Sequence, residues 1–161
     1  MSKLYGSLSN RLEEGKRFVD EIKVGDGVTM YYWSDRKAYE ITQVVDQKHF
    51  FMRQYDAKHI AVAFENNWQL ISNPENPEIE VMFRNNTWKS VRRFKKEEVE
   101  KYVDSMTDCN TREANLHLYR YYNQLSDKDM EKIESGKELV KYYKMEPISI
   151  GVADYYYDYE F

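Results

Sequence analysis

Histidine and cysteine offer the widest chemistry of any side chains, and this 161-residue chain has three histidines and one cysteine. His49 and His59 lie on strand-like segments with Asp46 and Asp56 close by, while His117 falls in a helical pattern. A metal site needs ligands that converge, but the sequence has no H-x-H or H-E-x-x-H spacing. We therefore interpret the histidines as partners in local hydrogen bonds and predict no metal and no other cofactor.

Cys109 is the single cysteine, so no disulfide can form within the chain. It follows Asp108 in an acidic, turn-like stretch, and acidic surroundings disfavour the reactive thiolate. The sequence also lacks the phosphate-binding G-x-x-x-x-G-K-[ST], the dinucleotide-binding G-x-G-x-x-G and the hydrolase G-x-S-x-G patterns. We predict that the protein is not an enzyme.

Aromatic and basic side chains make a better case for binding than for catalysis. An aromatic face stacks on a base or a cation, and a guanidinium group forks onto phosphate or carboxylate. The competing interpretation is that these aromatics belong to the core, because Phe, Trp and Tyr make up 16% of the chain. The residues predicted to meet at one end of the β-rich region are Trp33, either Tyr31 or Tyr32, Tyr39, Arg36 and Arg53.

A basic run occupies residues 89–96, where five cations occur: Lys89, Arg92, Arg93, Lys95 and Lys96. Such a run can contact the phosphates of a nucleic acid. Alternatively, its charges can prevent an exposed edge strand from pairing with another chain. The net charge of the whole chain is −4, which disfavours general binding to duplex nucleic acid. A local nucleic-acid contact through this run stays open.

The C-terminal segment 148–161, ISIGVADYYYDYEF, alternates between apolar and polar residues, but its apolar face changes parity after Ala153. Such a change requires a bulge or bend near 151–154. We predict that Tyr155, Tyr157, Tyr159 and Phe161 share a buried face, so that the tail belongs to the folded sheet. Tyr155 and Asp158 are also candidate partner contacts, because acidic and tyrosine side chains together can imitate a phosphate-bearing strand.

Six runs rich in β-branched and aromatic residues lie between residues 24 and 94, and turn residues separate them. Asn85-Asn86 between the last two runs predicts a two-residue hairpin, since Asn tolerates positive φ. The predicted strands cover residues 28–33, 38–46, 49–55, 68–72, 79–84 and 87–94.

Residues 95–136 follow a helical period instead, with three predicted helices. Thr111 and Ser126 are placed to cap the second and third helices, and Gly136 to end the third. The predicted inward residues are Val99, Tyr102, Val103 and Met106 on the first helix, Ala114, Leu118, Tyr121 and Leu125 on the second, and Met130 and Ile133 on the third.

The start of the β-rich region, over residues 24–55, resembles the SH3-like barrels of the KOW and Tudor kind. The resemblance rests on Val24-Gly25-Asp26-Gly27-Val28, then Ser34-Asp35-Arg36, then Ala38-Tyr39-Glu40-Ile41 and Val44-Val45-Asp46. It implies a small barrel. We therefore predict an α+β fold with an SH3-like β-barrel or a bent antiparallel sheet. Residues 1–161 are predicted to form one domain: a β-rich core at 24–94, a helical insertion at 95–136, and a C-terminal hairpin at 138–161 that returns to the fold.

Several sequence stretches are similar to small uncharacterised proteins of bacterial prophages and other mobile elements. They are Tyr5-Gly6-Ser7-Leu8 with Asn10-Arg11-Leu12-Glu13-Glu14, Trp33-Ser34-Asp35-Arg36 with Asp46-Gln47-Lys48-His49, and residues 151–161. Accessory genes of such elements commonly encode inhibitors of host defence, including anti-CRISPR proteins and proteins that sequester signalling nucleotides. The resemblance therefore implies a setting, a mobile element in a bacterial host, rather than an activity. The single cysteine indicates the reducing cytoplasm of that host.

We predict a non-catalytic counter-defence protein that binds and blocks a host defence effector such as a CRISPR nuclease. One alternative is a protein that holds a nucleotide messenger in an aromatic and basic pocket. Another is an SH3-like adaptor that contacts nucleic acid through residues 89–96. No stretch is apolar for the ~18 residues that a membrane span needs, and residues 1–15 lack the apolar core of a signal peptide, so no membrane partner is expected.

Overall fold

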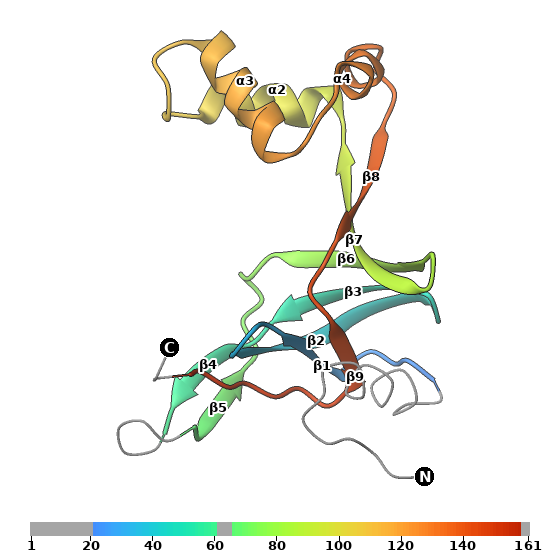
Figure 1. The fold of residues 1–161 in the computed structure, drawn as a ribbon, viewed down its shortest axis with the longest axis vertical. Helices are drawn as coiled ribbons and strands as arrows, with labels where there is room; N and C mark the ends of the chain where they lie inside the picture. Colours follow the sequence, from blue (N-terminus) through green and yellow to red (C-terminus); the bar gives the residue numbers. More distant parts are fainter. Residues whose placement is uncertain (1–20, 61–65, 159–161) are drawn as a thin grey trace. The chain divides into compact units, whose positions relative to one another are not determined.

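Seven strands form the main sheet of the computed structural model, which describes residues 21–60 and 66–158. Its strand order is β8-β7-β6-β3-β2-β1-β9, and a separate two-stranded sheet pairs β4 with β5 (Figure 1). The strands are β1 (Gly27–Tyr31), β2 (Arg36–Asp46), β3 (His49–Gln54), β4 (Asp56–His59), β5 (Trp68–Ile71), β6 (Glu78–Arg84), β7 (Thr87–Phe94), β8 (Leu139–Lys144) and β9 (Ile148–Gly151).

The described helices follow β7 in the order α2 (Lys96–Ser105), α3 (Arg112–Tyr122) and α4 (Asp127–Glu134). The α+β class predicted from the sequence is confirmed. The main sheet does not close on itself, so it takes the bent antiparallel form and not the barrel. Two shifts of register between β2 and β3, at Ile41/Gln43 and Val44/Asp46, mark where the long β2 strand bends.

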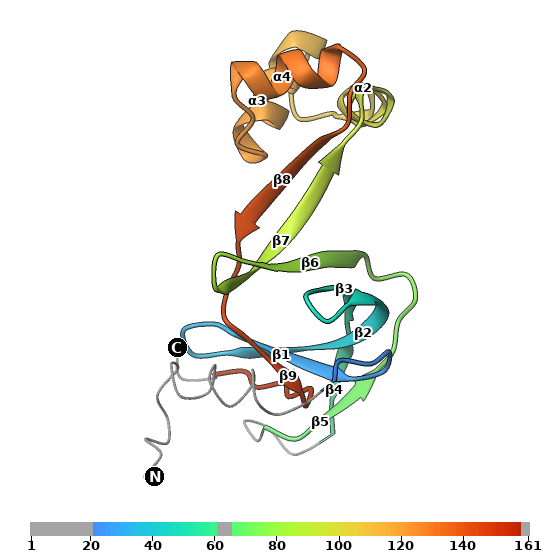
Figure 2. The same ribbon diagram turned by 90° about the vertical axis from the view of Figure 1, so that its right-hand side faces the viewer.

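The chain forms two compact units, which we call the sheet unit (residues up to 91 and from 143 onward) and the helical unit (residues 92–142). Strands β7 and β8, which lie side by side in Figure 2, each carry the chain from one unit to the other. Whether residues 1–161 behave as one domain stays a prediction.

The core of the sheet unit is built by strand alternation. Phe50 and Met52 of β3 are fully buried, and they pack with Val28 of β1 and Val81 of β6. The β6–β7 hairpin turns at Asn85 and Asn86, whose φ angles are +52° and +61°. This is the tight turn with two left-handed residues that the Asn-Asn pair predicted.

The predicted C-terminal hairpin is wrong. β8 lies beside β7, whereas β9 pairs antiparallel with β1, with Ile150 opposite Val28 and Ile148 opposite Met30. Ile148 and Ile150 are both buried in the sheet core. Pairing with β1 brings these two side chains into the same core cluster as Val28 and Met30, and this burial outweighs a local turn at Pro147.

The helical unit has its own core, formed by Phe94, Val99, Val103, Tyr119, Leu125, Met130, Ile133 and Leu139. The predicted caps are confirmed: the Thr111 hydroxyl accepts from Ala114 N, Ser126 forms a capping box with Asp129, and Gly136 follows α4 with a φ of +86°. These local signals depend on neighbouring residues only, which is why the sequence predicts them well.

The predicted inward face of the second helix is wrong in part, although Leu125, which was also predicted inward, is buried. Ala114 and Tyr121 are exposed, while Asn115 and Tyr119 are buried. The Asn115 side chain accepts from Cys109 N (2.9 Å) and donates to Met106 O (3.2 Å), so it holds the loop between α2 and α3. A polar residue that is buried for its hydrogen bonds breaks the apolar period on which the prediction relied. Tyr102 of α2, also predicted inward, is 59% exposed.

Candidate binding surface

The turn between β1 and β2 presents the most exposed large apolar side chain among the described residues. Tyr31 pairs with Arg36 at the end of the two strands, and Tyr32 N donates to Asp35 O (2.9 Å) to close the turn. Trp33 stands in this turn with 91% of its surface exposed. The Lys37 ammonium lies 4.9 Å from the centre of the Tyr32 ring, so the neighbouring aromatic is covered while the indole is not.

Residues 152–158, which we call the strap, follow β9 and lie along β1 toward this turn (Figure 1). The Thr29 hydroxyl, buried to 1% exposure, donates to Val152 O (2.7 Å) and accepts from Asp154 N (3.0 Å). A Cβ at Gly27 would lie only 2.3 Å from Ala153 N. The strap therefore passes so closely over β1 that glycine is required at position 27.

Arg36 fixes the strap to the turn. Its backbone exchanges two hydrogen bonds with Tyr156, at 2.9 and 3.0 Å, and its guanidinium group donates to the Asp154 carboxylate. The same guanidinium lies 5.2 Å from the centre of the Tyr156 ring. Further along the strap, Asp158 N donates to the Asp35 carboxylate at 2.7 Å. The turn that carries Trp33 is thus held on one side by backbone, ionic and cation–π contacts.

The β4–β5 hairpin also contacts the strap. The Trp68 ring meets the Tyr155 ring edge-on, with the centroids 4.7 Å apart, and the His59 ring lies 4.7 Å from Trp68 on the hairpin itself. The Asn66 carboxamide oxygen accepts from both Trp68 Nε1 (3.0 Å) and Tyr157 N (2.9 Å). Trp33, Asp35 and Arg36, together with Tyr156, Tyr157 and Asp158 of the strap, form what we call the tip surface.

Of the residues predicted to meet, only Trp33 and Arg36 lie on the tip surface. Tyr39 is 3% exposed and packs with the sheet core, so its prediction as a binding residue is wrong; burial raises the pKa of its phenol. Alternation along β2 places Tyr39 on the same face as Ile41. Arg53 is engaged elsewhere, donating to Asn76 O (2.9 Å) and pairing with Glu78 (3.4 Å).

The predicted buried face of the tail is wrong for the part that the structure describes. Strand β9 ends at Gly151, whose φ is +129°, and Tyr157 is 45% exposed. The parity change at 151–154 marks the start of the strap rather than a bulge inside one long strand. Tyr155 and Asp158 do lie in the strap, with Tyr155 against Trp68, while Tyr159 and Phe161 lie outside the described residues.

The basic run does not form one face. Arg92 and Arg93 are neighbours on β7 and so point to opposite sides of the strand. Arg93 pairs with Glu138 at 3.0 Å, and Lys95 with the same carboxylate at 3.7 Å. The Arg92 guanidinium lies over the Phe94 ring and donates to the Asn123 side chain, whereas Lys89 belongs to the sheet unit.

The residues with the widest chemistry have structural partners. His49 Nε2 lies 2.7 Å from the Glu80 carboxylate on the next strand, and both side chains are largely buried. Cys109 N donates to Asn115 in the α2–α3 loop. Within residues 21–60 and 66–158, no group of three or more His, Cys, Asp or Glu side chains is placed to hold a metal ion.

The residues that sequence reasoning missed are Gly27, Thr29, Asp154 and Tyr156, which fasten the strap. The parity change near 151–154 was the one available signal, since it marked the place where the chain leaves the sheet. A partner more than a hundred residues away, such as Thr29 for Val152, leaves no periodic trace in the sequence.

Comparison with known proteins adds no relative: a scan against family models, a search of curated proteins and a search of solved structures each found no match. None of the helices that the structure describes is long and apolar enough to cross a membrane. Function must therefore be inferred from the surfaces of this chain alone.

Proposed function

We propose that this protein is a non-catalytic counter-defence protein of a mobile element, acting in the cytoplasm of a bacterial host. It binds and blocks a host defence effector, of which a CRISPR nuclease is one example. The observation that carries the binding role is the 91% exposure of Trp33. Tryptophan is the residue most enriched among those that dominate protein–protein affinity, and its indole gains a large apolar burial when a partner pocket covers it.

The support around Trp33 favours a binding role over an accidental exposure. Arg36 is held by Tyr156 and Asp154, and Asp35 accepts from both its own turn and the strap. A residue presented on a braced turn loses little conformational freedom on binding, which lowers the entropic cost of association. A flexible loop would lose conformational entropy each time it bound a partner, and this loss would weaken binding.

The composition of the tip surface suits a protein partner. Tyr157 adds a second, 45% exposed aromatic, and Asp35, Arg36 and Asp158 place both signs of charge nearby. An apolar anchor within a mixed polar rim is the usual anatomy of a protein interface. The alternatives have less support, since Tyr39 and Arg53 are not available to a nucleotide pocket and Glu138 binds two cations of the basic run.

The test is a plaque assay on matched host strains that differ only by one defence system, with CRISPR systems among them. Expression of the full chain should restore plaques on at least one defended strain, and Trp33→Ala should abolish most of that restoration. Tyr122→Ala is the matched control, because Tyr122 is 70% exposed but lies on the helical unit. It should behave as the unsubstituted chain.

Circular dichroism melts establish that both variants fold, as expected for exposed side chains. Equal protection by Trp33→Ala and the unsubstituted chain, at equal protein levels, contradicts the role of the tip surface. Absence of restored plaques on every defended strain contradicts the counter-defence proposal itself.

A further inference from the structure

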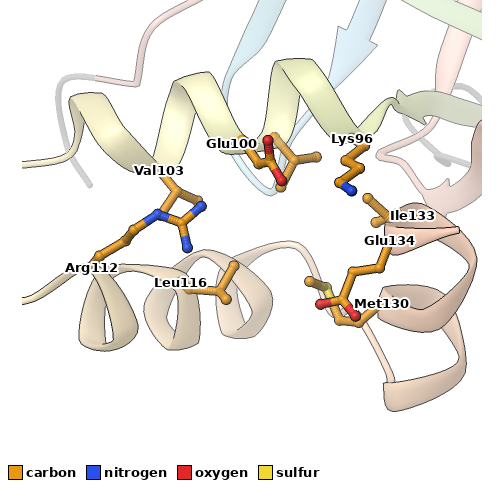
Figure 3. Close-up of a pocket in the computed structure, with 9 residues that line it drawn as sticks. Lys96, Glu100, Val103, Arg112, Leu116, Met130, Ile133 and Glu134 are labelled. Atoms are coloured by element: carbon orange, nitrogen blue, oxygen red, sulfur yellow. The ribbon is translucent and has the colours of Figure 1, made fainter. Parts of the chain in front are cut away.

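A cavity of about 80 Å³ opens between the three described helices of the helical unit (Figure 3). Its floor is apolar and comes from core residues: Val99 and Val103 of α2, Met130 and Ile133 of α4, with the partly buried Leu116 of α3. These floor residues are held by packing on their other sides. The cavity is therefore a feature of a formed core rather than a gap between loose side chains.

The size of the cavity selects its occupant. An engineered apolar cavity of about 150 Å³ accepts a benzene ring. A cavity of about 80 Å³ has roughly half that room, which suits a branched or unbranched aliphatic side chain and excludes indole. An alanine methyl would leave most of the floor uncovered and lose the dispersion contacts that the floor offers.

Charges at the opening add a second constraint. Four ionisable side chains line it: Lys96 and Glu100 of α2, Arg112 of α3 and Glu134 of α4 (Figure 3). Arg112 already donates to Asp104 at 2.9 Å. Lys96, Glu100 and Glu134 are exposed and make no ion pair with any residue that the structure describes. Two unengaged carboxylates against one unengaged ammonium leave the opening negative, so a basic neighbour is favoured.

We propose that this cavity receives one aliphatic side chain, of leucine or methionine size, from a peptide segment of a partner protein that carries Lys or Arg beside it. The aliphatic group covers the floor formed by Val99, Val103 and Ile133, and the cations lie against Glu100 and Glu134. This site belongs to the helical unit and rests neither on Trp33 nor on a role in host defence.

The experiment uses the full chain with its Met and Ile methyl groups labelled, and follows Met130 and Ile133 by NMR. The probe is the tripeptide acetyl-Lys-Leu-Lys-amide, which should shift both signals and reach saturation at millimolar concentration. Acetyl-Lys-Ala-Lys-amide should bind at least about tenfold more weakly than the leucine peptide. This is the factor expected when two or more buried methyl or methylene groups are lost. Acetyl-Lys-Trp-Lys-amide should also bind at least about tenfold more weakly than the leucine peptide, because its indole ring is too large for the cavity.

Reversing the charges of the peptide distinguishes specific recognition from nonspecific hydrophobic binding. Acetyl-Glu-Leu-Glu-amide should bind about threefold more weakly than the lysine peptide, as exposed ion pairs allow. In Glu134→Lys this order should reverse, whereas Glu131→Lys, an exposed α4 residue away from the cavity, should leave it unchanged. Absence of saturable shifts at Met130 and Ile133, equal binding of the alanine or tryptophan peptide, or no change of order in Glu134→Lys each overturns the proposal.

Discussion

The tip surface and the helical cavity display apolar groups in opposite ways. At the tip a whole indole projects into solvent while the polar groups beside it are engaged with one another. At the cavity the apolar groups are recessed and three of the polar groups around them are unengaged. A protruding aromatic side chain is complementary to a concave surface, whereas a recessed apolar floor is complementary to a protruding side chain. The two regions therefore differ in the shape of surface that each would fit.

The two regions also differ in how the sequence assembles them. Contacts that brace the tip join residues far apart in the chain: Arg36 and Asp154 are 118 residues apart, and Thr29 and Asp154 are 125 apart. The cavity is lined by residues 96–134 alone. The tip thus depends on long-range closure of the chain, whereas the cavity depends on local helices and their caps. This contrast predicts which changes should harm one region and spare the other.

The largest effect should come from removing the strap by ending the chain after Gly151. Thr29 would lose two hydrogen bonds, Arg36 its contacts with Asp154 and Tyr156, and Trp68 its ring contact with Tyr155. We expect the free energy of unfolding, measured in urea, to fall by about 4 kcal/mol or more. Native-state hydrogen exchange should rise most in β1 and β2. A larger rise in α2–α4 would contradict the division between the two regions.

An intermediate effect should follow from Gly27→Ala. The added Cβ would lie 2.3 Å from Ala153 N and 2.8 Å from the Val152 carbonyl carbon, so the strap must move. Close contacts of this kind typically cost about 1–3 kcal/mol of folding free energy. The cost should vanish when the same substitution is made in the chain that ends after Gly151. A cost that persists there would mean that the clash with the strap is not its cause.

The smallest effect concerns acid. Burial raises the pKa of Asp129, but hydrogen bonds from Lys141 and Ser126 outweigh it, so the pKa lies below the usual value for aspartate. A lowered folded-state pKa stabilises the protein above the unfolded pKa of about 4, and this stabilisation is lost as pH falls through the folded value.

In Asp129→Asn, the loss of stability between pH 5 and pH 3 should be about 0.5–1 kcal/mol smaller than in the unsubstituted chain. Urea unfolding at the two pH values measures the difference. Asp108→Asn is the control, because Asp108 is exposed and makes no ion pair with any residue that the structure describes. Equal pH dependence in all three chains would contradict the role assigned to the Asp129 contacts.

The sequence correctly predicts the structural features that depend on residues close together in the chain. The hairpin at Asn85 and Asn86 and the caps at Thr111 and Ser126 all formed where they were expected, because each depends on side chains within a few positions. The positions of most strands followed from their β-branched and aromatic runs. The short strand β4 was missed, since Asp56–His59 has no β-branched residue and Ala57 is its single apolar side chain.

Pairing over long distances was not predictable from these signals. The alternation at Ile148 and Ile150 predicted one strand of a local hairpin. Nothing in the spacing of these residues indicates that β1 is the strand with which they pair. In the candidate site, Trp33 and Tyr39 are both aromatic residues close to the same turn, yet one is exposed and the other buried. Their fates differ because Tyr39 lies within β2, where alternation decides the face, while Trp33 lies in the turn, where it does not.

The hydroxyl of Thr29 has consequences for timing during synthesis. Its partner Val152 is made 123 residues later, a delay of roughly 6–25 s at ribosomal rates of about 5–20 residues per second. Until then the nascent chain carries Trp33 on a turn that lacks Asp154 and Tyr156. A transcript cut short before residue 152 would therefore yield a polypeptide with the helical cavity but without a finished tip. The contacts that brace the Trp33 turn are therefore complete only after residues 152–158 have been made.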